Sequence, residues 1–221
     1  MNKIKLIIFD LDGTLYNLND VVTMNYQMQL NFYSAYTSKS KKEVIEIFEK
    51  NNIFPVMTEK SKSATEFFAR MDISVDEWND YRESLFDVTA ICTKNAVGFE
   101  LIEKFRYFSP LVLLSSNSLN NIHRILKYIN ISSDLFDEIV CSDNKYGDGI
   151  FKKIDEMKLI AERKCISTNA MLSIGDRYKT DIDPIIRLGG QGIVVDGPQD
   201  LKVVYEAMKS KDFTNIKIFG A

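Results

Sequence analysis

Short apolar runs that alternate with amphipathic stretches dominate the second half of the chain, and one such run opens it. Residues 4–9 are almost entirely apolar and rich in isoleucine, which is typical of a buried strand in a parallel sheet. The same pattern predicts further strands at 111–115, 138–141, 170–174 and 192–195. Helical spacing of apolar residues predicts helices at 99–108, 120–128, 150–158, 184–188 and 201–209. This alternation predicts an α/β fold with a doubly wound parallel sheet.

Residues 16–94 have a different character, because their apolar positions follow helical spacing and no convincing strand interrupts them. A crossover between parallel strands needs only about a dozen residues, so this block is far longer than the connection requires. We therefore expect a core domain of residues 1–15 and 95–221, with an inserted helical cap domain at 16–94. The core of that cap is expected to include its aromatic residues, Tyr26, Phe32, Tyr33, Tyr36 and Trp78.

Composition agrees with a globular protein. The chain has 221 residues, of which 45% are hydrophobic and 27% charged, and its formal net charge is -3. A chain of this size buries roughly 70% of its unfolded surface without a disulfide or metal. This small negative net charge gives no indication of binding to nucleic acid or to an anionic membrane. Three scattered cysteines and the absence of a signal-peptide or membrane-spanning pattern predict a cytoplasmic protein.

Polar residues follow the predicted strands, at the edge of the sheet where α/β proteins bind ligands. In chain order they are Asp10, Asp12, Gly13 and Thr14 after the first strand, Ser116 and Asn117 after the second, Lys145 after the third, and Asp176 and Asp181 after the fourth. Because the carboxyl ends of parallel strands meet at one edge, we expect these acids, the hydroxyl, the amide and the single cation to share a crevice.

The acids in this set indicate a metal site. Asp10 and Asp12 are two residues apart, so on an extended segment their side chains face the same way. Neighbouring carboxylates repel unless a proton or cation lies beside them, and Asp176 adds a third. Oxygen ligands without histidine or cysteine favour Mg²⁺. One aspartate can act as a nucleophile that forms an acyl-phosphate, and a second can transfer protons. Gly13 permits a tight turn whose N–H groups can hold a phosphate.

At this point the residues resemble a known family. Asp-Leu-Asp-Gly-Thr-Leu at 10–15 resembles motif I of the haloacid-dehalogenase-like (HAD) hydrolase superfamily, and Leu-Leu-Ser-Ser-Asn at 113–117 resembles motif II. Lys145 resembles the motif III lysine, and residues 174–181 resemble motif IV. The motifs stand in family order, each after a predicted strand. The resemblance implies a Rossmann-like core, and the helical insertion lies where the family places its type C1 cap.

The resemblance also implies roles for the four acids. Asp10 would be the nucleophile, and Asp12 the general acid and base. The Mg²⁺ ligands would be the side chains of Asp10 and Asp176 and the backbone carbonyl of Asp12. Asp181 would lie outside this ligand set and orient Lys145 or a water on the metal.

Two further residues would hold the phosphoryl group. Ser116 would donate a hydrogen bond to it, and Lys145 would hold both the phosphate and the nucleophile. The family usually has proline after the motif III lysine, whereas Tyr146 stands there in this chain, so Lys152 or Lys153 remains open as an alternative to Lys145. The remaining substrate-binding positions are expected to be Gly13, Thr14 and Asn117.

Asp12 distinguishes the reactions known in the superfamily. Members that resemble dehalogenases or phosphonatases lack this aspartate, whereas expulsion of an alkoxide from a phosphate ester requires a proton. We therefore expect an Mg²⁺-dependent phosphomonoester hydrolase that acts through an aspartyl-phosphate on a small soluble phosphometabolite, such as a nucleotide or sugar phosphate. The alternatives are a phosphomutase of the β-phosphoglucomutase type and a non-catalytic regulatory binding protein. We expect a monomer or homodimer that binds neither nucleic acid nor membranes.

Overall fold

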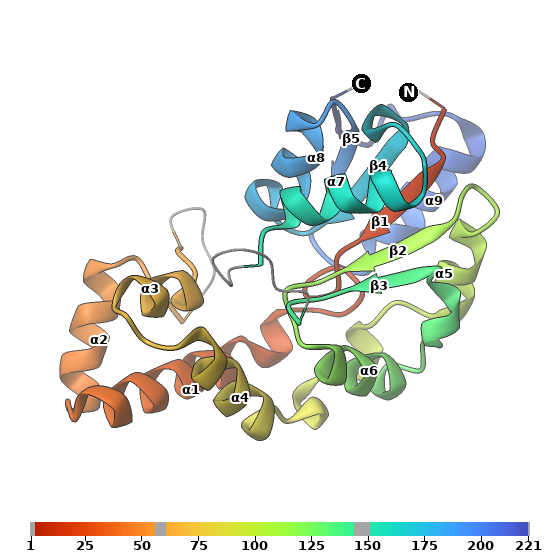
Figure 1. Ribbon diagram of the computed structural model, residues 1–221. Coiled ribbons are helices and arrows are strands. Elements are labelled where there is room, and N and C mark those ends of the chain that lie inside the picture. The colour runs from red at the N-terminus through yellow and green to blue at the C-terminus, as the bar shows by residue number, and fades with distance from the viewer. Residues whose placement is uncertain (1–2, 56–60, 144–150, 221) are drawn as a thin grey trace. The chain divides into compact units, whose positions relative to one another are not determined.

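The computed structural model describes residues 3–55, 61–143 and 151–220 (Figure 1). The chain divides into two compact units. The core unit contains the chain up to Leu18 and the described residues from Ile91 onward, and the helical unit contains Asn19–Ala90. The boundaries expected from the sequence are 15/16 and 94/95, and the division in the structure falls at 18/19 and 90/91.

The core unit is built on one six-stranded sheet with the order β3-β2-β1-β4-β5-β6. Its strands are β1 (Leu6–Phe9), β2 (Leu111–Leu114), β3 (Glu138–Val140), β4 (Met171–Gly175), β5 (Gln191–Val194) and β6 (Ile218–Phe219). The first five pair in parallel, with Ile8 opposite Val112 on one side and Ser173 on the other. The predicted α/β fold is thus confirmed. The sequence analysis does not predict β6, which pairs antiparallel with β5.

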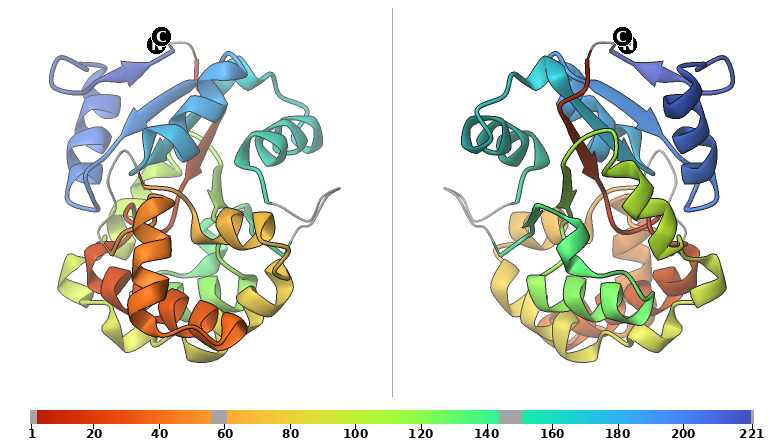
Figure 2. Two further views of the ribbon diagram at one scale, coloured as in Figure 1. Left: turned by 90° about the vertical axis from the view of Figure 1, so that its left-hand side faces the viewer. Right: turned by 90° about the vertical axis from the view of Figure 1, so that its right-hand side faces the viewer.

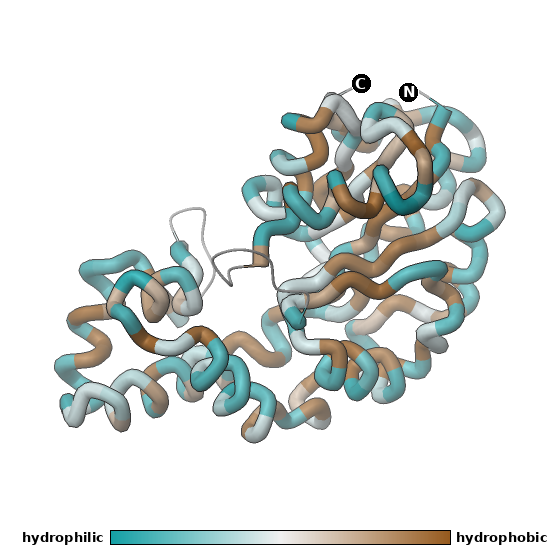
Figure 3. The backbone as a smooth tube through the Cα atoms, viewed as in Figure 1, coloured by the Kyte–Doolittle hydropathy of each residue, from teal (hydrophilic) through white to brown (hydrophobic). Residues whose placement is uncertain are grey.

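Helices cover both faces of this sheet, and Figure 2 shows α7 and α9 on opposite sides of it. The helices of the core unit are α5 (Phe99–Phe105), α6 (Leu119–Tyr128), α7 (Lys153–Arg163), α8 (Asp183–Arg187) and α9 (Asp200–Ser210). Leu6 and Ile8 pack with Met157 of α7 in one buried cluster. Phe9, whose side chain points to the other face, meets the Phe105 ring of α5 at a centroid distance of 5.1 Å. Figure 3 accordingly shows a hydrophobic stretch along β2.

Short helical turns complete the core unit. The 3₁₀ turns of the described chain are Val88–Ala90, Thr93–Asn95, Ser133–Leu135 and Thr168–Ala170, of which the first belongs to the helical unit. A single π-helical turn, Tyr178–Ile182, follows β4 and leads into α8. No described helix is long and apolar enough to cross a membrane.

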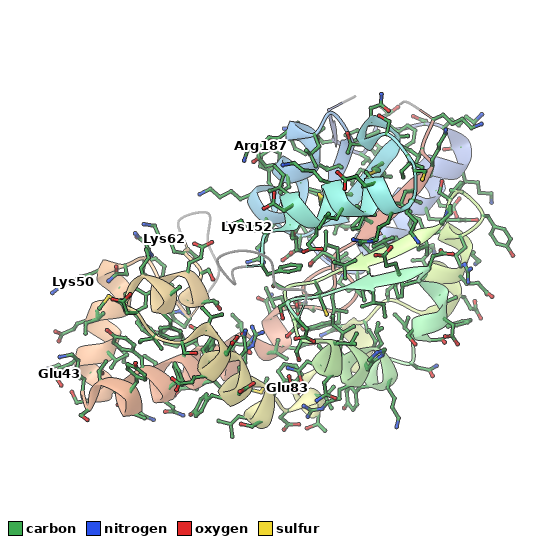
Figure 4. All side chains as sticks on the ribbon, viewed as in Figure 1. Glu43, Lys50, Lys62, Glu83, Lys152 and Arg187 are labelled. Carbon is green, nitrogen blue, oxygen red and sulfur yellow. The ribbon has the colours of Figure 1, made fainter. Side chains whose placement is uncertain are left out.

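The helical unit consists of α1 (Asn19–Thr37), α2 (Lys41–Lys50), α3 (Ala64–Arg70) and α4 (Val75–Leu85). Ser40 and Glu43 form a capping box at the start of α2. Figure 4 labels Glu43. The expected aromatic core is present. The Phe32 ring lies 5.2 Å from both Trp78 and Tyr81 between centroids. Tyr36 is the exception, because 52% of its surface is exposed.

Candidate active site

Asp10 and Lys153 form the buried centre of the site. Asp10 directly follows β1, and its backbone N–H donates to the carbonyl of Ile174 on β4 at 3.0 Å. Lys153 is the first residue of α7, and its Nζ lies 2.5 Å from Asp10 Oδ1 and 2.7 Å from Asp181 Oδ1. All three side chains are buried. One ammonium group therefore bridges two carboxylates that come from the ends of neighbouring strands.

The structure thus places Lys153 against the acid expected to be the nucleophile. Lys145, the lysine that resembles motif III, lies outside the described residues. Lys152 is exposed at the start of α7, where Figure 4 labels it. The expected helix at 150–158 begins instead at Lys153. The sequence contains an indication that Lys153 faces inward. Lys153 lies four residues before Met157, so both side chains lie on the same, buried face of α7.

Asp12 is held by donors from three directions. Asn117 Nδ2 donates to both of its carboxylate oxygens, at 3.0 Å to Oδ1 and 2.8 Å to Oδ2. The hydroxyl of Tyr16 donates to Oδ1, and Ser115 Oγ lies 3.5 Å from Oδ2. Asn117 was expected to face the substrate, and in the structure its amide is directed at Asp12. Tyr16 is not among the site residues expected from the sequence.

Asp176 approaches the motif I turn closely, and glycine makes this approach possible. Gly13 has a φ of +83°, and a Cβ added there would lie 2.3 Å from Asp176 Oδ2. Asp176 follows Gly175 at the end of β4. Carboxylate oxygens of Asp10, Asp176 and Asp181 all lie within 4.8 Å of one another. The structure therefore brings together acids that follow two different strands, Asp10 after β1 and Asp176 and Asp181 after β4.

The turn after β4 aims Asp181 back into this cluster. Its Oδ2 accepts the backbone N–H of Arg177 at 2.9 Å, and its Oδ1 accepts Lys153 Nζ and Thr180 Oγ1. Ser173 Oγ fixes the backbone by donating to the Asp181 carbonyl at 2.7 Å. Asp181 is 1% exposed. Both of its carboxylate oxygens are thus engaged by protein donors, which suits a residue that orients Lys153 rather than one that binds a metal directly.

The remaining predicted residues lie at the same strand ends. Thr14 is buried, with Oγ1 3.5 Å from Asp10 Oδ2. Ser116 is exposed, one residue beyond the buried Ser115 that follows β2.

Burial and mutual repulsion shift the protonation of the acids. Burial raises the pKa of Asp10 to about 7 despite the opposing charge of Lys153. Burial, followed by the charges of Asp10 and Asp181, raises the pKa of Asp176 to about 8. Burial opposes ionisation of Asp181 as well, but Lys153 and Arg177 hold its pKa below the ordinary value. The protein alone therefore does not supply enough positive charge to ionise all three acids.

The donor set fits a hard divalent cation such as Mg²⁺. The cluster offers carboxylate oxygens without histidine or cysteine. Asp176 Oδ1 is buried and has no hydrogen-bond partner among the described residues, and the nearby cation, Arg177, has its Nε 3.9 Å away. A buried carboxylate oxygen without a donor is costly unless a cation completes its surroundings. Asp10 and Asp176 are the side chains that would hold the ion.

The chain belongs to the haloacid dehalogenase-like hydrolases, because the model of that family matches residues 4–189. This match spans all four strand ends described above and the helical unit between the first two. It confirms the superfamily suggested by the motifs. No curated protein matches the chain.

Solved structures share the fold at low sequence identity. A HAD phosphatase from Thermococcus onnurineus is 17% identical with a TM-score of 0.59, covering 91% of this chain and 97% of that one. A haloacid dehalogenase-like family hydrolase from Xanthomonas campestris is 16% identical with a TM-score of 0.55, covering 95% and 94%. A β-phosphoglucomutase from Clostridium difficile is 22% identical with a TM-score of 0.54, covering 95% and 98%. At these identities the likeness shows the fold.

Proposed function

We propose that this hydrolase is an Mg²⁺-dependent phosphomonoesterase that acts on a small phosphorylated metabolite through a phosphoryl group held on Asp10. The observation that carries the proposal is the position of Asp12. Its carboxylate is held two residues from Asp10, beside the acidic cluster, by Asn117 and Tyr16. This arrangement provides a nucleophile and a separate proton carrier, which are the two groups that ester hydrolysis by this route requires.

The reaction would proceed in two displacements. A carboxylate oxygen of Asp10 attacks phosphorus, and the bond from phosphorus to the ester oxygen breaks while Asp12 donates its proton to that oxygen. Asp12, now ionised, then takes a proton from water as the water oxygen attacks phosphorus. The bond between phosphorus and Asp10 breaks, and inorganic phosphate leaves. The first displacement leaves Asp12 ionised, and the second returns its proton and frees Asp10. The site is thus restored with water as the only further reactant.

Other residues of the site supply charge and orientation. A divalent ion held by Asp10 and Asp176 would ionise these acids and offset the charge of the phosphate. Lys153 holds the Asp10 carboxylate in place and would neutralise the phosphoryl oxygens beside it. Ser116, the second residue after β2, would donate a hydrogen bond to them.

The presence of Asp12 also favours phosphoryl transfer over carbon–halogen cleavage as the reaction. A halide leaves without a proton, so a dehalogenase has no use for a second carboxyl beside its nucleophile. The buried donors committed to Asp12 would then serve no purpose in the reaction. The helical unit, inserted after the motif I turn and built from helices, supports assignment as a type C1 cap.

Phosphate release tests this proposal. The purified protein should hydrolyse p-nitrophenyl phosphate in the presence of Mg²⁺ and lose the activity when a chelator removes the metal. A panel of nucleotide, sugar and other small phosphate esters should then identify the preferred substrate. Equal rates with metal and with chelator would refute the metal assignment. Conversion of a hexose 1-phosphate into its 6-phosphate without release of phosphate would favour the mutase over the hydrolase.

A further inference from the structure

Tyr16 is a fully buried tyrosine whose hydroxyl donates a hydrogen bond to the carboxylate of Asp12. The backbone on either side of it is pinned to the chain that returns from the helical unit. Val97 donates its N–H to the carbonyl of Leu15 at 2.7 Å, and Asn17 donates to the carbonyl of Asn95 at 3.0 Å. These two hydrogen bonds hold the backbone that carries the Tyr16 ring, and they thereby position the hydroxyl against Asp12.

An aspartate carboxyl needs such support if it is to transfer a proton. Rotation about the bond between Cβ and the carboxyl carbon of aspartate is soft, with a broad distribution of angles. General acid catalysis requires the proton to be aimed at the leaving oxygen, and small displacements are costly in rate. Asn117 fixes the plane of the Asp12 carboxylate by donating to both oxygens. Tyr16 adds a second donor on Oδ1, whereas the second donor on Oδ2, Ser115 Oγ, lies 3.5 Å away.

We infer that Tyr16 is a positioning residue that aims Asp12 at the leaving group of the substrate. This inference rests on the proposed function, because it assigns Tyr16 a part in proton donation by Asp12. Tyr16 itself touches neither the nucleophile nor the phosphoryl group in this assignment. Its effect is confined to the two proton transfers that Asp12 makes, first to the departing ester oxygen and later from the attacking water.

That confinement gives a signature that a purely structural role would not produce. An alkyl phosphate expels a strongly basic alkoxide, which needs the proton of Asp12. The p-nitrophenolate ion is a weak base and leaves with little help. The value of kcat/KM reports the steps up to departure of the leaving group, so it isolates the first of the two proton transfers.

The experiment compares Tyr16→Phe with the wild-type protein on ethyl phosphate and p-nitrophenyl phosphate. Removal of the hydroxyl should lower kcat/KM for ethyl phosphate by about tenfold or more, while the value for p-nitrophenyl phosphate falls by less than about threefold. The matched control is Tyr205→Phe, which removes a hydroxyl from a half-buried ring that packs against Phe105 in the same unit. It should change neither value, and the melting temperature of each variant reports on folding.

A double variant tests whether Tyr16 acts through Asp12. In an Asp12→Asn background, where no proton is available, Tyr16→Phe should cause no further loss on ethyl phosphate. Equal losses on both esters, or additive losses in the double variant, would overturn the inference and leave the proposed hydrolase intact. A wild-type protein that hydrolyses neither ester with Mg²⁺ would instead refute the proposed function, and this inference with it.

Discussion

Lys153 sets the balance of charge within the site. Its ammonium group contacts Asp10 and Asp181, and these two carboxylates raise the pKa of the lysine although burial opposes the charge. Removal of one member of a buried ion pair leaves the other members uncompensated in a poorly solvated place. The lysine is thus needed both by the folded state and by the proposed nucleophile.

Replacement of this lysine should therefore affect stability and activity together. Lys153→Met should lower the free energy of unfolding by about 3–5 kcal/mol in urea titrations and reduce phosphate release by about 100-fold or more. Lys158→Met, on an exposed position of the same helix, is the control and should stay within about 0.5 kcal/mol of the wild type. If Lys145→Met abolishes activity while Lys153→Met retains it, the role passes to Lys145.

The raised pKa values of two acids predict how metal binding depends on pH. Asp10 ionises at about 7 and Asp176 at about 8 in the folded protein. In the unfolded chain both ionise near pH 4, so between about pH 4 and 8 the folded state holds protons that the unfolded state has lost. The metal-free protein should therefore lose stability as the pH rises through this window. Mg²⁺ displaces these protons, so its affinity should increase with pH.

Two measurements check this dependence. Thermal unfolding of the metal-free protein should occur at a lower temperature at about pH 8 than at about pH 6, and calorimetric titration should show tighter Mg²⁺ binding at the higher pH. Asp176→Asn should remove most of the pH dependence of binding together with the affinity. Metal-free protein that becomes more stable over this range would contradict the assignment of raised pKa values.

At the residue scale, the sequence predicts the acids better than their partners. Asp10, Asp12 and Asp176 follow closely after apolar runs. Because the carboxyl ends of parallel strands lie at one edge of the sheet, the positions of these acids do not depend on the conformation of the loops. Lys153 and Tyr16 reach the site through tertiary packing. The start of α7 decides which lysine faces inward, and the path of the chain after Gly13 decides where the Tyr16 hydroxyl points.

Among the structural elements, the motif I turn is the one whose backbone the site constrains most closely. Gly13 combines a left-handed conformation with the approach of Asp176. A side chain at this position would strain the backbone and also displace a proposed metal ligand. A substitution at Gly13 should therefore both destabilise the turn and weaken metal binding.

Gly13→Ala tests this coupling. The variant should weaken Mg²⁺ binding by at least about tenfold and lower the melting temperature, because the new Cβ and the Asp176 carboxylate need the same space. Gly98→Ala is the matched control, since a Cβ there would meet nothing within 4 Å and its φ is -75°. Unchanged Mg²⁺ affinity in Gly13→Ala would show that Asp176 is not held by this turn as a ligand.

Element boundaries were harder to predict than element types. The five parallel strands follow from their apolar runs, but β6 has only two residues and no periodicity to reveal it. The start of α7 is displaced from residue 150 to Lys153 because Lys152 is extended, with φ -123° and ψ 111°. The N-cap position is occupied by Lys152, which is not one of the residue types that usually mark a helix start.

At the scale of the whole molecule, the length of the block between the first two strands predicts an inserted unit, and the structure divides into two compact units. The helical unit has its own aromatic core around Phe32 and Trp78, and the core unit has its own sheet. The identity of the substrate was beyond the sequence, because helical periodicity indicates which side chains are buried and not which exposed ones contact a ligand. The screen of phosphate esters proposed above addresses that choice.

The most direct test of the account is to trap the phosphoryl group on Asp10. The protein is quenched during turnover of a phosphate ester with Mg²⁺ and treated with borohydride, which reduces an acyl-phosphate to the alcohol. Peptide mass spectrometry should then find Asp10 converted to homoserine, in a reaction that requires both substrate and metal and that fails in Asp10→Asn. Rapid hydrolysis with no such conversion, or with the conversion at a different acid, would contradict the central role assigned to Asp10.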